Sequence, residues 1–454
     1  MTVIGVIFII LSILWFRNIN KLTVLLIISA IFEAATIFNA SGGDRSIGLQ
    51  PYYYVLLIIF VHYALKINFF NRLRIQSTIF FFLLYSLVVT VIASAIFSHI
   101  LVYTPSKGID ITDISTLTPL TIGLSNFVQI MYLALNVSVY TFIINDQKIK
   151  ISSNKVFRNV GIIAIIFGLL QIILPFISIA YPYTFTNNNL GFAQGYNQSS
   201  RLLLYRTVSS FIEPSSAGSY FASLFIFSFV LIVKKIGKFY INGAIAVFSA
   251  LIVFTSASST GILTLLVSMA AFIVYSIIDL LKSKKISFIT IAAYASLASI
   301  TTASAVLIPQ VAEIFQDSIL NKSSTNSFDN RGRSNIYSVD ILSQSYGLGV
   351  GIGSNRPSGF FFYLLSNTGV IGTLLFFAFL ASLLFTLLSG SGKPQSKMEI
   401  SKSQPLMWAF LAILLSKIIA QPDLSQPSFW ILILLLGIRI NQTRHDRNLR
   451  GGML

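Results

Sequence analysis

The sequence lacks several residue types, and each absence limits the class of protein. It contains no cysteine among its 454 residues, which excludes disulfides and thiolate metal sites. Only 10% of the residues are charged, against about 25% in an ordinary soluble domain, so the composition excludes a soluble globular protein. The three histidines and the scattered acids form no pattern typical of a metal site or a Ser-His-Asp triad. Residues 1–16 have neither a basic start nor a small-residue cleavage site, so we expect no cleaved signal peptide.

Long apolar runs dominate what is present, since 55% of the residues are hydrophobic. A bilayer span needs about 20 apolar residues, and in lipid its backbone groups must pair within the segment, so the spans should be helices. We predict an all-α polytopic membrane protein with about thirteen transmembrane helices, built as a single domain over residues 1–454. The predicted spans are 2–16, 22–38, 51–66, 77–100, 118–144, 159–181, 214–233, 239–254, 261–278, 287–308, 359–388, 406–420 and 427–438.

The basic residues predict the orientation of these spans. Of 31 lysines and arginines, 22 fall in alternate loops and in the C-terminal tail, 8 fall in the other loops, and Lys417 lies inside a span. The net charge of +17 would suggest nucleic acid in a soluble protein, but here it fits the excess of Lys and Arg in cytoplasmic loops. We therefore expect the C-terminus in the cytoplasm, the N-terminus outside and no nucleic-acid partner.

Two large polar loops, at residues 183–213 and 309–357, then face outward. The first contains Arg201 and Arg206 and ends at Glu213, directly before a proline that opens the next span. Residues 201–213 have apolar positions suited to an interfacial helix. The two arginines either snorkel to lipid headgroups or bind an anion; two outward loops that both concentrate arginine favour the anion.

The second loop is the richer in charge. It is expected to contain an amphipathic helix over 310–320, a loop over 321–330 and a helix over 334–343. Its glycines at 347, 349, 351 and 353 lack the Lys-Ser/Thr pair of a phosphate loop, so we interpret them as bare backbone that allows close approach. The charged and aromatic candidates for substrate contact in this loop are Arg331, Arg333, Tyr337, Asp340 and Arg356, with Asp329 a further acid.

Two ionisable residues lie within predicted spans. Glu33 is in the second span and Lys417 in the twelfth. Charges inside a membrane are functional candidates by default, while a paired structural contact is an equally good interpretation.

The two outward loops contain motifs that resemble a known family. The runs are RTVSSFIEPSSAGSYFASLFI from Arg206 and RSNIYSVDILSQSYGLGVGIGSN from Arg333, the latter followed by a span that contains GVIG at Gly369–Gly372. An outer-loop arginine, an aromatic one helical turn later, a glycine ladder and a small-residue span resemble the O-antigen polymerase and ligase superfamily. The match covers residues 200–220 and 331–375; elsewhere only hydropathy and length agree.

The resemblance implies a glycosyltransferase of the C type in the bacterial inner membrane, with its active site facing the periplasm. Such a protein uses no cofactor and no nucleotide sugar. It transfers a glycan from undecaprenyl pyrophosphate to an acceptor hydroxyl. Membrane lipids, a flippase and a chain-length regulator are further expected partners. The family's pyrophosphate-binding arginines correspond best to Arg206 and Arg333, and next to Arg201 and Arg331.

One departure separates the two activities of this family. The ligases of this superfamily have a histidine just before the span that follows the glycine ladder, whereas this chain has none there. The departure favours a Wzy-type polymerase over an O-antigen ligase, with a lipid-linked oligosaccharide flippase as the alternative of another class. Glu213 is the first candidate for the base that accepts the hydroxyl proton, and Asp340 is the next; Glu213 alternatively orients Arg206.

Overall fold

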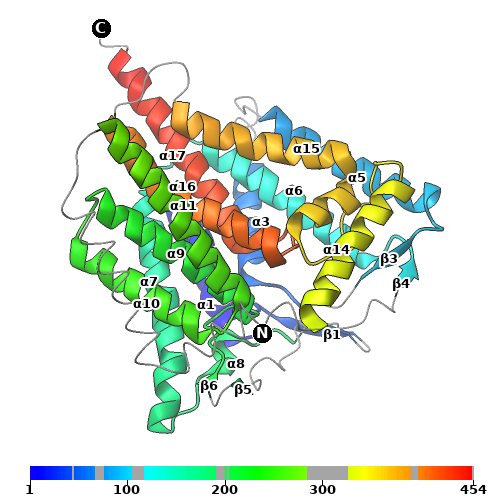
Figure 1. The fold of residues 1–454 in the computed structure, drawn as a ribbon, viewed down its shortest axis with the longest axis horizontal. Helices are drawn as coiled ribbons and strands as arrows, with labels where there is room; N and C mark the ends of the chain where they lie inside the picture. Colours follow the sequence, from blue (N-terminus) through cyan, green and yellow to red (C-terminus); the bar gives the residue numbers. More distant parts are fainter. Residues whose placement is uncertain are drawn as a thin grey trace.

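Helices make up most of the computed structural model, which describes residues 1–42, 45–66, 76–104, 117–190, 200–201, 204–283, 326–389 and 397–451 (Figure 1). The predicted tenth span, 287–308, and the predicted helix over 310–320 lie outside these residues. The helices are α1 (Val3–Trp15), α2 (Ile19–Ser29), α3 (Pro51–Ala64), α5 (Ser77–Ile96), α6 (Leu124–Asn145), α7 (Ser153–Ile173), η1 (Leu174–Ile177), α8 (Tyr183–Thr186), α9 (Pro214–Val233), α10 (Phe239–Thr255), α11 (Ser259–Ser283), α14 (Asn326–Gln344), α15 (Phe360–Ser389), α16 (Lys397–Ala420) and α17 (Pro427–Gly451).

Seven helical segments in the described part of the chain are long and apolar enough to cross a membrane. They lie at Ser77–Ile96, Leu124–Asn145, Ser153–Ile177, Pro214–Val233, Ser259–Asp279, Phe360–Leu388 and Ser401–Ala420. Four further apolar helices, α1, α2, α3 and α10, are shorter than that criterion. The chain is therefore a helical protein with the character of a membrane protein.

Short hairpins add a small amount of sheet to the expected all-helical fold. The described residues contain three antiparallel pairs, each between two helices: β1 (Asn39–Gly42) with β2 (Arg45–Gly48), β3 (Leu101–Tyr103) with β4 (Leu117–Pro119), and β5 (Ser200–Arg201) with β6 (Leu204–Tyr205). All three fall in loops that the charge pattern predicts to face outward.

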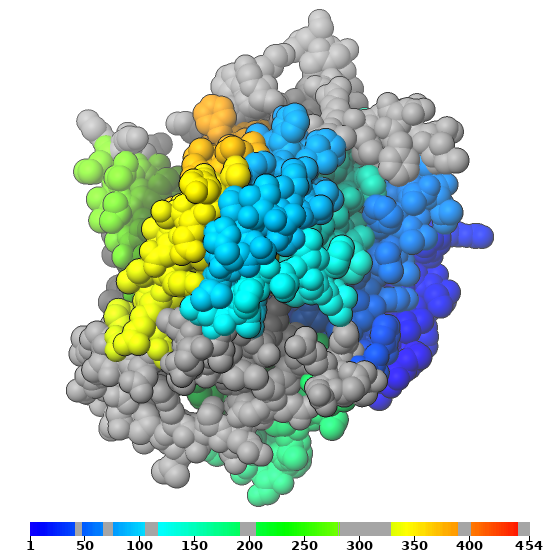
Figure 2. All heavy atoms as spheres, turned by 90° about the vertical axis from the view of Figure 1, so that its right-hand side faces the viewer, coloured from blue at the N-terminus to red at the C-terminus, as the bar shows by residue number. Residues whose placement is uncertain are grey.

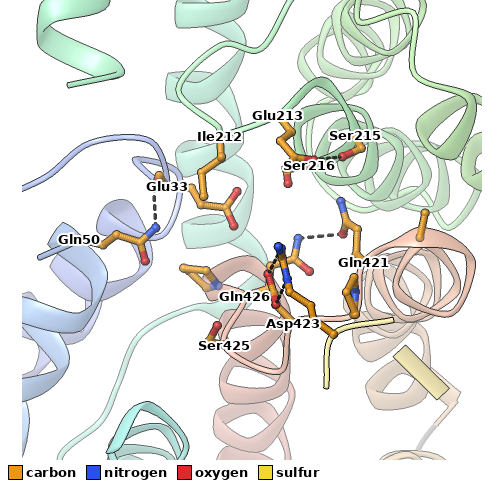
Figure 3. Close-up of a pocket in the computed structure, with 14 residues that line it drawn as sticks. Glu33, Gln50, Ile212, Glu213, Ser215, Ser216, Gln421, Asp423, Ser425 and Gln426 are labelled. Atoms are coloured by element: carbon orange, nitrogen blue, oxygen red, sulfur yellow. Dashed lines mark hydrogen bonds and ion pairs between the residues drawn. The ribbon is translucent and has the colours of Figure 1, made fainter. Parts of the chain in front are cut away.

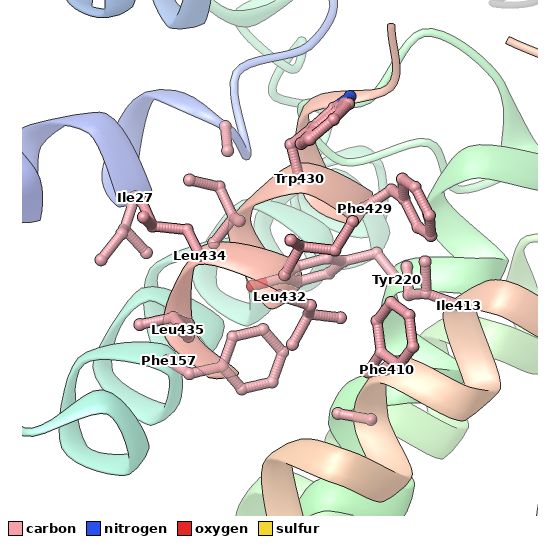
Figure 4. Close-up of a cluster of buried hydrophobic side chains, with 14 of the residues drawn as sticks. Ile27, Phe157, Tyr220, Phe410, Ile413, Phe429, Trp430, Leu432, Leu434 and Leu435 are labelled. Carbon is pink, nitrogen blue, oxygen red and sulfur yellow. The ribbon is translucent and has the colours of Figure 1, made fainter. Parts of the chain in front are cut away.

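The most buried of these seven segments is α9, which packs between α10, α11 and α16. Small residues permit this, because a Cβ added at Gly218 would lie 3.0 Å from the Cα of Gly261 on α11. The first half of α17 also lies in the core: Figure 4 shows Phe429 and Leu432 among side chains of α9 and α16, with Phe157 of α7 close by. The predicted span 427–438 is thus the apolar, buried start of a longer helix whose second half is polar.

Hydrogen bonds join the loops into two separate sets. In the set predicted to be cytoplasmic, the Asn20 amide donates to the carbonyl of Lys148 and the Asn154 amide to that of Lys402, at 2.9 and 2.8 Å. In the other set, the Thr36 amide donates to the side chain of Asn188 at 2.9 Å, and the Arg356 amide to the carbonyl of Tyr103 at 2.8 Å. The contacts therefore group the loops in the same alternation as the basic residues.

The structure corrects three local predictions. The second helix ends at Ser29 rather than near residue 38, so Glu33 lies in a buried turn after it. In this turn the backbone amide of Ala34 donates to the carbonyl of Ser210. Residues 206–213 form no helix: Ser209 has φ +55°, and its amide donates to the Gln171 side chain at 2.7 Å. Asn326–Asn330, expected as loop, is instead the start of α14.

Helix α14 confirms the helix predicted over 334–343 and lies at one side of the molecule. Figure 2 shows it (yellow) beside the segment that contains α5 and β3 (light blue). The Tyr337 hydroxyl joins the two by donating to the carbonyl of Leu101 at 2.9 Å.

Candidate functional site

A polar cavity of about 100 Å³ lies among the ends of several helices (Figure 3). Its walls come from the turn after α2, the start of α3, the start of α9, the segment before α15 and the segment that joins α16 to α17. The lining residues are Glu33, Gln50, Ile212, Glu213, Ser215, Ser216, Arg356, Ala420, Gln421, Pro422, Asp423, Ser425, Gln426 and Pro427. All of these segments lie at the helix ends that the charge pattern predicts to face outward.

Arg356 and Asp423 form the central ion pair of the cavity. The arginine donates from Nε and from a terminal nitrogen to the two carboxylate oxygens of Asp423, at 3.2 and 3.1 Å. The two side chains are 23% and 21% exposed, so the pair is largely shielded from solvent. Burial acts to lower the pKa of Arg356, but the Asp423 charge and hydrogen bonds outweigh it and raise the pKa. The guanidinium is therefore a fixed positive charge.

Glu213 faces this pair from the start of α9. Its carboxylate accepts a hydrogen bond from the Ser215 hydroxyl at 3.1 Å, and its charge is a further cause of the raised pKa of Arg356. Glu213 is the N-cap residue of α9, where the helix dipole interacts favourably with a negative charge. Helix α9 is in turn held by its core packing, so the carboxylate stands on a rigid element.

Lys417 fixes the floor of the cavity from inside α16. The ammonium is fully buried and donates to the carbonyl of Asp423 at 2.5 Å and to the side-chain oxygen of Gln426 at 3.2 Å. The rings of Phe360 and Phe429 lie 4.7 and 5.1 Å from it. Lys417 thus binds the α16–α17 segment that supplies Gln421, Asp423 and Gln426.

Glu33 lines the opposite wall. It is 5% exposed, and its carbonyl accepts from the Gln50 side chain at 2.7 Å. Glu33 and Lys417 are the two ionisable residues predicted within spans. Glu33 lines the cavity, and Lys417 lies beneath it, where it contacts a backbone carbonyl and a side-chain amide.

Arg356 is positioned by a network of amide side chains, in which Asn367 of α15 holds the segment directly before that helix. The Asn367 oxygen accepts from the backbone amides of Ser354 and Asn355 at 3.2 and 3.0 Å, and the Asn367 nitrogen donates to the carbonyl of Asn355 at 2.8 Å. The Asn355 nitrogen then donates to the Ser338 hydroxyl of α14 at 3.0 Å. The network holds the backbone directly before the arginine.

The glycine ladder approaches neighbouring backbone closely, as its sequence predicts. Gly349 and Gly351 have φ of +86° and +94°. An added Cβ would lie 2.5 Å from the amide of Gly369 at the first glycine and 2.7 Å from Thr90 Cα of α5 at the second. Gly369 itself has φ +62°, where α15 is kinked. The ladder thus fits between α5 and the kink of α15.

Arg206 contacts the end of another helix. Its guanidinium donates to the carbonyls of Ser256 and Ala257 at 3.1 Å each, directly after α10. Arginine at a helix C-terminus satisfies carbonyls that lack helical partners. Its predicted catalytic role stays a prediction. Arg201 ends β5, and its side chain lies outside those described.

The remaining predicted residues lie on α14. Arg333 and Asp340 are exposed, Arg331 is half-buried, and Tyr337 binds β3 through its hydroxyl. Burial, and next the Asp340 charge, raise the pKa of Tyr337. None of these four is among the residues that line the described cavity.

The structure thus brings Glu213 and Arg356, from the ends of the two loops predicted to face outward, to one cavity. Sequence reasoning missed the third contributor, the segment Gln421–Gln426. Its signal is a short polar run, QPDLSQ, between two strongly apolar runs, with two amides and one acid in six residues.

The described part of the chain contains no group of three or more His, Cys, Asp or Glu residues that could hold a metal ion. The three carboxyl-bearing residues of the cavity are thus not placed as a metal ligand set. A scan against protein-family models and a search of curated proteins find no match to this chain.

Proposed function

We propose that this protein is a membrane glycosyltransferase that polymerises undecaprenyl-pyrophosphate-linked oligosaccharide units into O-antigen or a related surface polysaccharide. The observation that carries the proposal is that Glu213 and Arg356, from the two loops with the family resemblance, line one polar cavity. Transfer from a phosphate leaving group to a hydroxyl requires a base for the hydroxyl proton, which Glu213 in this cavity can supply. It also requires guanidinium groups for the leaving group, which the other arginines of the same two loops can supply.

The proposal includes the thirteen-span topology, with the N-terminus and the cavity at the outer face of the bacterial inner membrane and the C-terminus in the cytoplasm. The alternation of basic loops supports this orientation. A lipid-linked pyrophosphate lies at headgroup height, which is where outward helix ends would lie.

In the proposed reaction, the acceptor hydroxyl oxygen attacks the anomeric carbon of the donor sugar. The bond from that carbon to the pyrophosphate oxygen breaks, and its electron pair leaves with the pyrophosphate. Glu213 accepts the hydroxyl proton. Guanidinium groups stabilise the charge that grows on the leaving group; Arg333, Arg331 and Arg206 are the proposed contacts, with Arg201 next.

The test uses purified protein in proteoliposomes with lipid-linked repeat units and no nucleotide sugar. We expect glycan to lengthen while it stays on the lipid pyrophosphate. Transfer to a different acceptor lipid without lengthening would indicate the ligase. Movement of the lipid-linked unit across the bilayer with no new glycosidic bond would indicate the flippase, and either result would overturn the proposed polymerase.

A further inference from the structure

The charge of the cavity differs from that of a pyrophosphate site. Three carboxyl-bearing residues, Glu33, Glu213 and Asp423, line it, against the single guanidinium of Arg356, which already forms two hydrogen bonds with Asp423. Lys417 adds one positive charge beneath. A pyrophosphate in this partly buried cavity would be repelled by the negative charges of the carboxylates, so the cavity disfavours an anion.

The direction of one buried hydrogen-bond chain shows what the cavity offers instead. The Lys417 ammonium is a donor only, so the Gln426 oxygen that faces it must accept. The Gln426 nitrogen then donates to the Gln421 oxygen at 2.9 Å. The buried lysine therefore sets the orientation of both amides, which would otherwise be ambiguous between oxygen and nitrogen.

The chain ends at the Gln421 amide nitrogen. Gln421 is 8% exposed, lines the cavity, and its nitrogen has no hydrogen-bond partner among the residues that the structure describes. In Figure 3 this nitrogen points away from Gln426, towards Ser216 and Glu213. A buried amide donor without a partner costs about 1–3 kcal/mol, which an oxygen atom of a ligand would recover.

We propose that this cavity is the subsite for the terminal sugar of the acceptor glycan, with Gln421 donating to one hydroxyl oxygen and Glu213 accepting from a neighbouring hydroxyl. Hydroxyl groups are both donors and acceptors, so adjacent hydroxyls match an amide N–H beside carboxylates. The inward N–H donor needs an acceptor oxygen, which a bare cation lacks, and the acids disfavour an anion, so a neutral polyol is the class that fits. This subsite rests on the proposed function and separates the neutral acceptor from the anionic donor, whose arginine contacts lie outside the cavity lining.

The size of the cavity agrees with one sugar unit. One water molecule occupies roughly 10–15 Å³ of a cavity, so a cavity of about 100 Å³ holds several waters. The hydroxyl groups of a single sugar ring would replace a similar number of waters. An oligosaccharide would extend beyond it.

The experiment measures binding of methyl glycosides of glucose, galactose, mannose and N-acetylglucosamine to the full chain in nanodiscs, by saturation-transfer NMR. We expect at least one to bind wild-type protein, with an affinity reduced about tenfold in Gln421→Leu, the loss of one buried hydrogen bond. Gln421→Glu, which keeps the shape but replaces the donor by an acid, should reduce it as far. Inorganic pyrophosphate should not displace the glycoside.

A matched control is Gln404→Leu, a buried glutamine that donates to the Tyr275 hydroxyl. Gln404 lies in the first half of α16, whereas Gln421 directly follows the end of that helix. It should leave glycoside binding unchanged. No binding of any glycoside to wild-type protein, wild-type affinity in the two Gln421 variants, or displacement by pyrophosphate would each overturn the subsite. Binding requires no turnover. A protein that binds a glycoside but makes no polymer would therefore contradict the proposed function and leave the sugar-binding site in place.

Discussion

Glu213 combines three features that suit a base: it lies in the cavity, occupies the N-cap position of a well-packed helix, and lies near a paired guanidinium. We predict that Glu213→Gln lowers polymer formation on the order of 100-fold or more, because the amide has a similar shape but accepts no proton. Asp329→Asn is the matched control: this acid is exposed on the first turn of α14, and its variant should polymerise normally. Polymer length and folded protein are measured in the same membranes; normal polymer from the Glu213 variant would remove it as the base.

Arg333 is exposed on α14 and available to a ligand at the surface. We predict that Arg333→Ala abolishes chain extension, on the order of 100-fold, because leaving-group charge grows as the bond breaks. Arg333→Lys should restore activity only in part, since it keeps the charge but loses the two parallel hydrogen bonds. Folding should be unchanged, and long polymer from a well-expressed Arg333→Ala protein would exclude the role.

Among the elements, the glycine ladder is the part whose substitution should damage the fold most. We predict that Gly349→Ala destabilises the protein by about 2–4 kcal/mol, because φ +86° strains a side chain and the Cβ meets the Gly369 amide at 2.5 Å. Gly332→Ala, in α14 with nothing within 4 Å of an added Cβ, should be neutral or stabilise by up to about 1 kcal/mol. Thermal unfolding of both variants in detergent checks this; equal midpoints would show that the ladder is not tightly packed.

The sequence predicts helices well where a long apolar run leaves no other solution, as in α5, α9 and α15. It fails where distant residues satisfy the backbone. The turn at Glu33 depends on Ser210, and the irregular run 206–213 depends on the Gln171 side chain, which lies far away in the sequence. Local patterns contain no information about either partner.

The candidate site shows the same limit. Charge patterns find Glu213 and Arg356, since both stand at the edges of predicted spans. They do not find Gln421, because its orientation depends on the buried Lys417 through Gln426. Those three side chains meet through the turn of the segment that joins α16 to α17.

At the scale of the whole molecule, the proposed function requires the cavity to lie at the outer face of the membrane. The two sets of loops joined by hydrogen bonds agree with the alternation of basic residues, and the cavity belongs to the set predicted outside. Because the chain contains no cysteine, a single introduced cysteine reports its own surroundings without a background.

The measurement that tests this most directly uses Ser216→Cys at the edge of the cavity, with Ser152→Cys, exposed between α6 and α7, as the control. A bulky maleimide that cannot cross membranes is added to sealed vesicles of known orientation, and polymer formation from lipid-linked units is followed. We predict that Ser216→Cys is labelled only from the outer face and then stops polymerising, whereas Ser152→Cys is labelled only from the cytoplasmic face and stays active. Full labelling at position 216 with unchanged polymer, or labelling there from the cytoplasmic face, would contradict it.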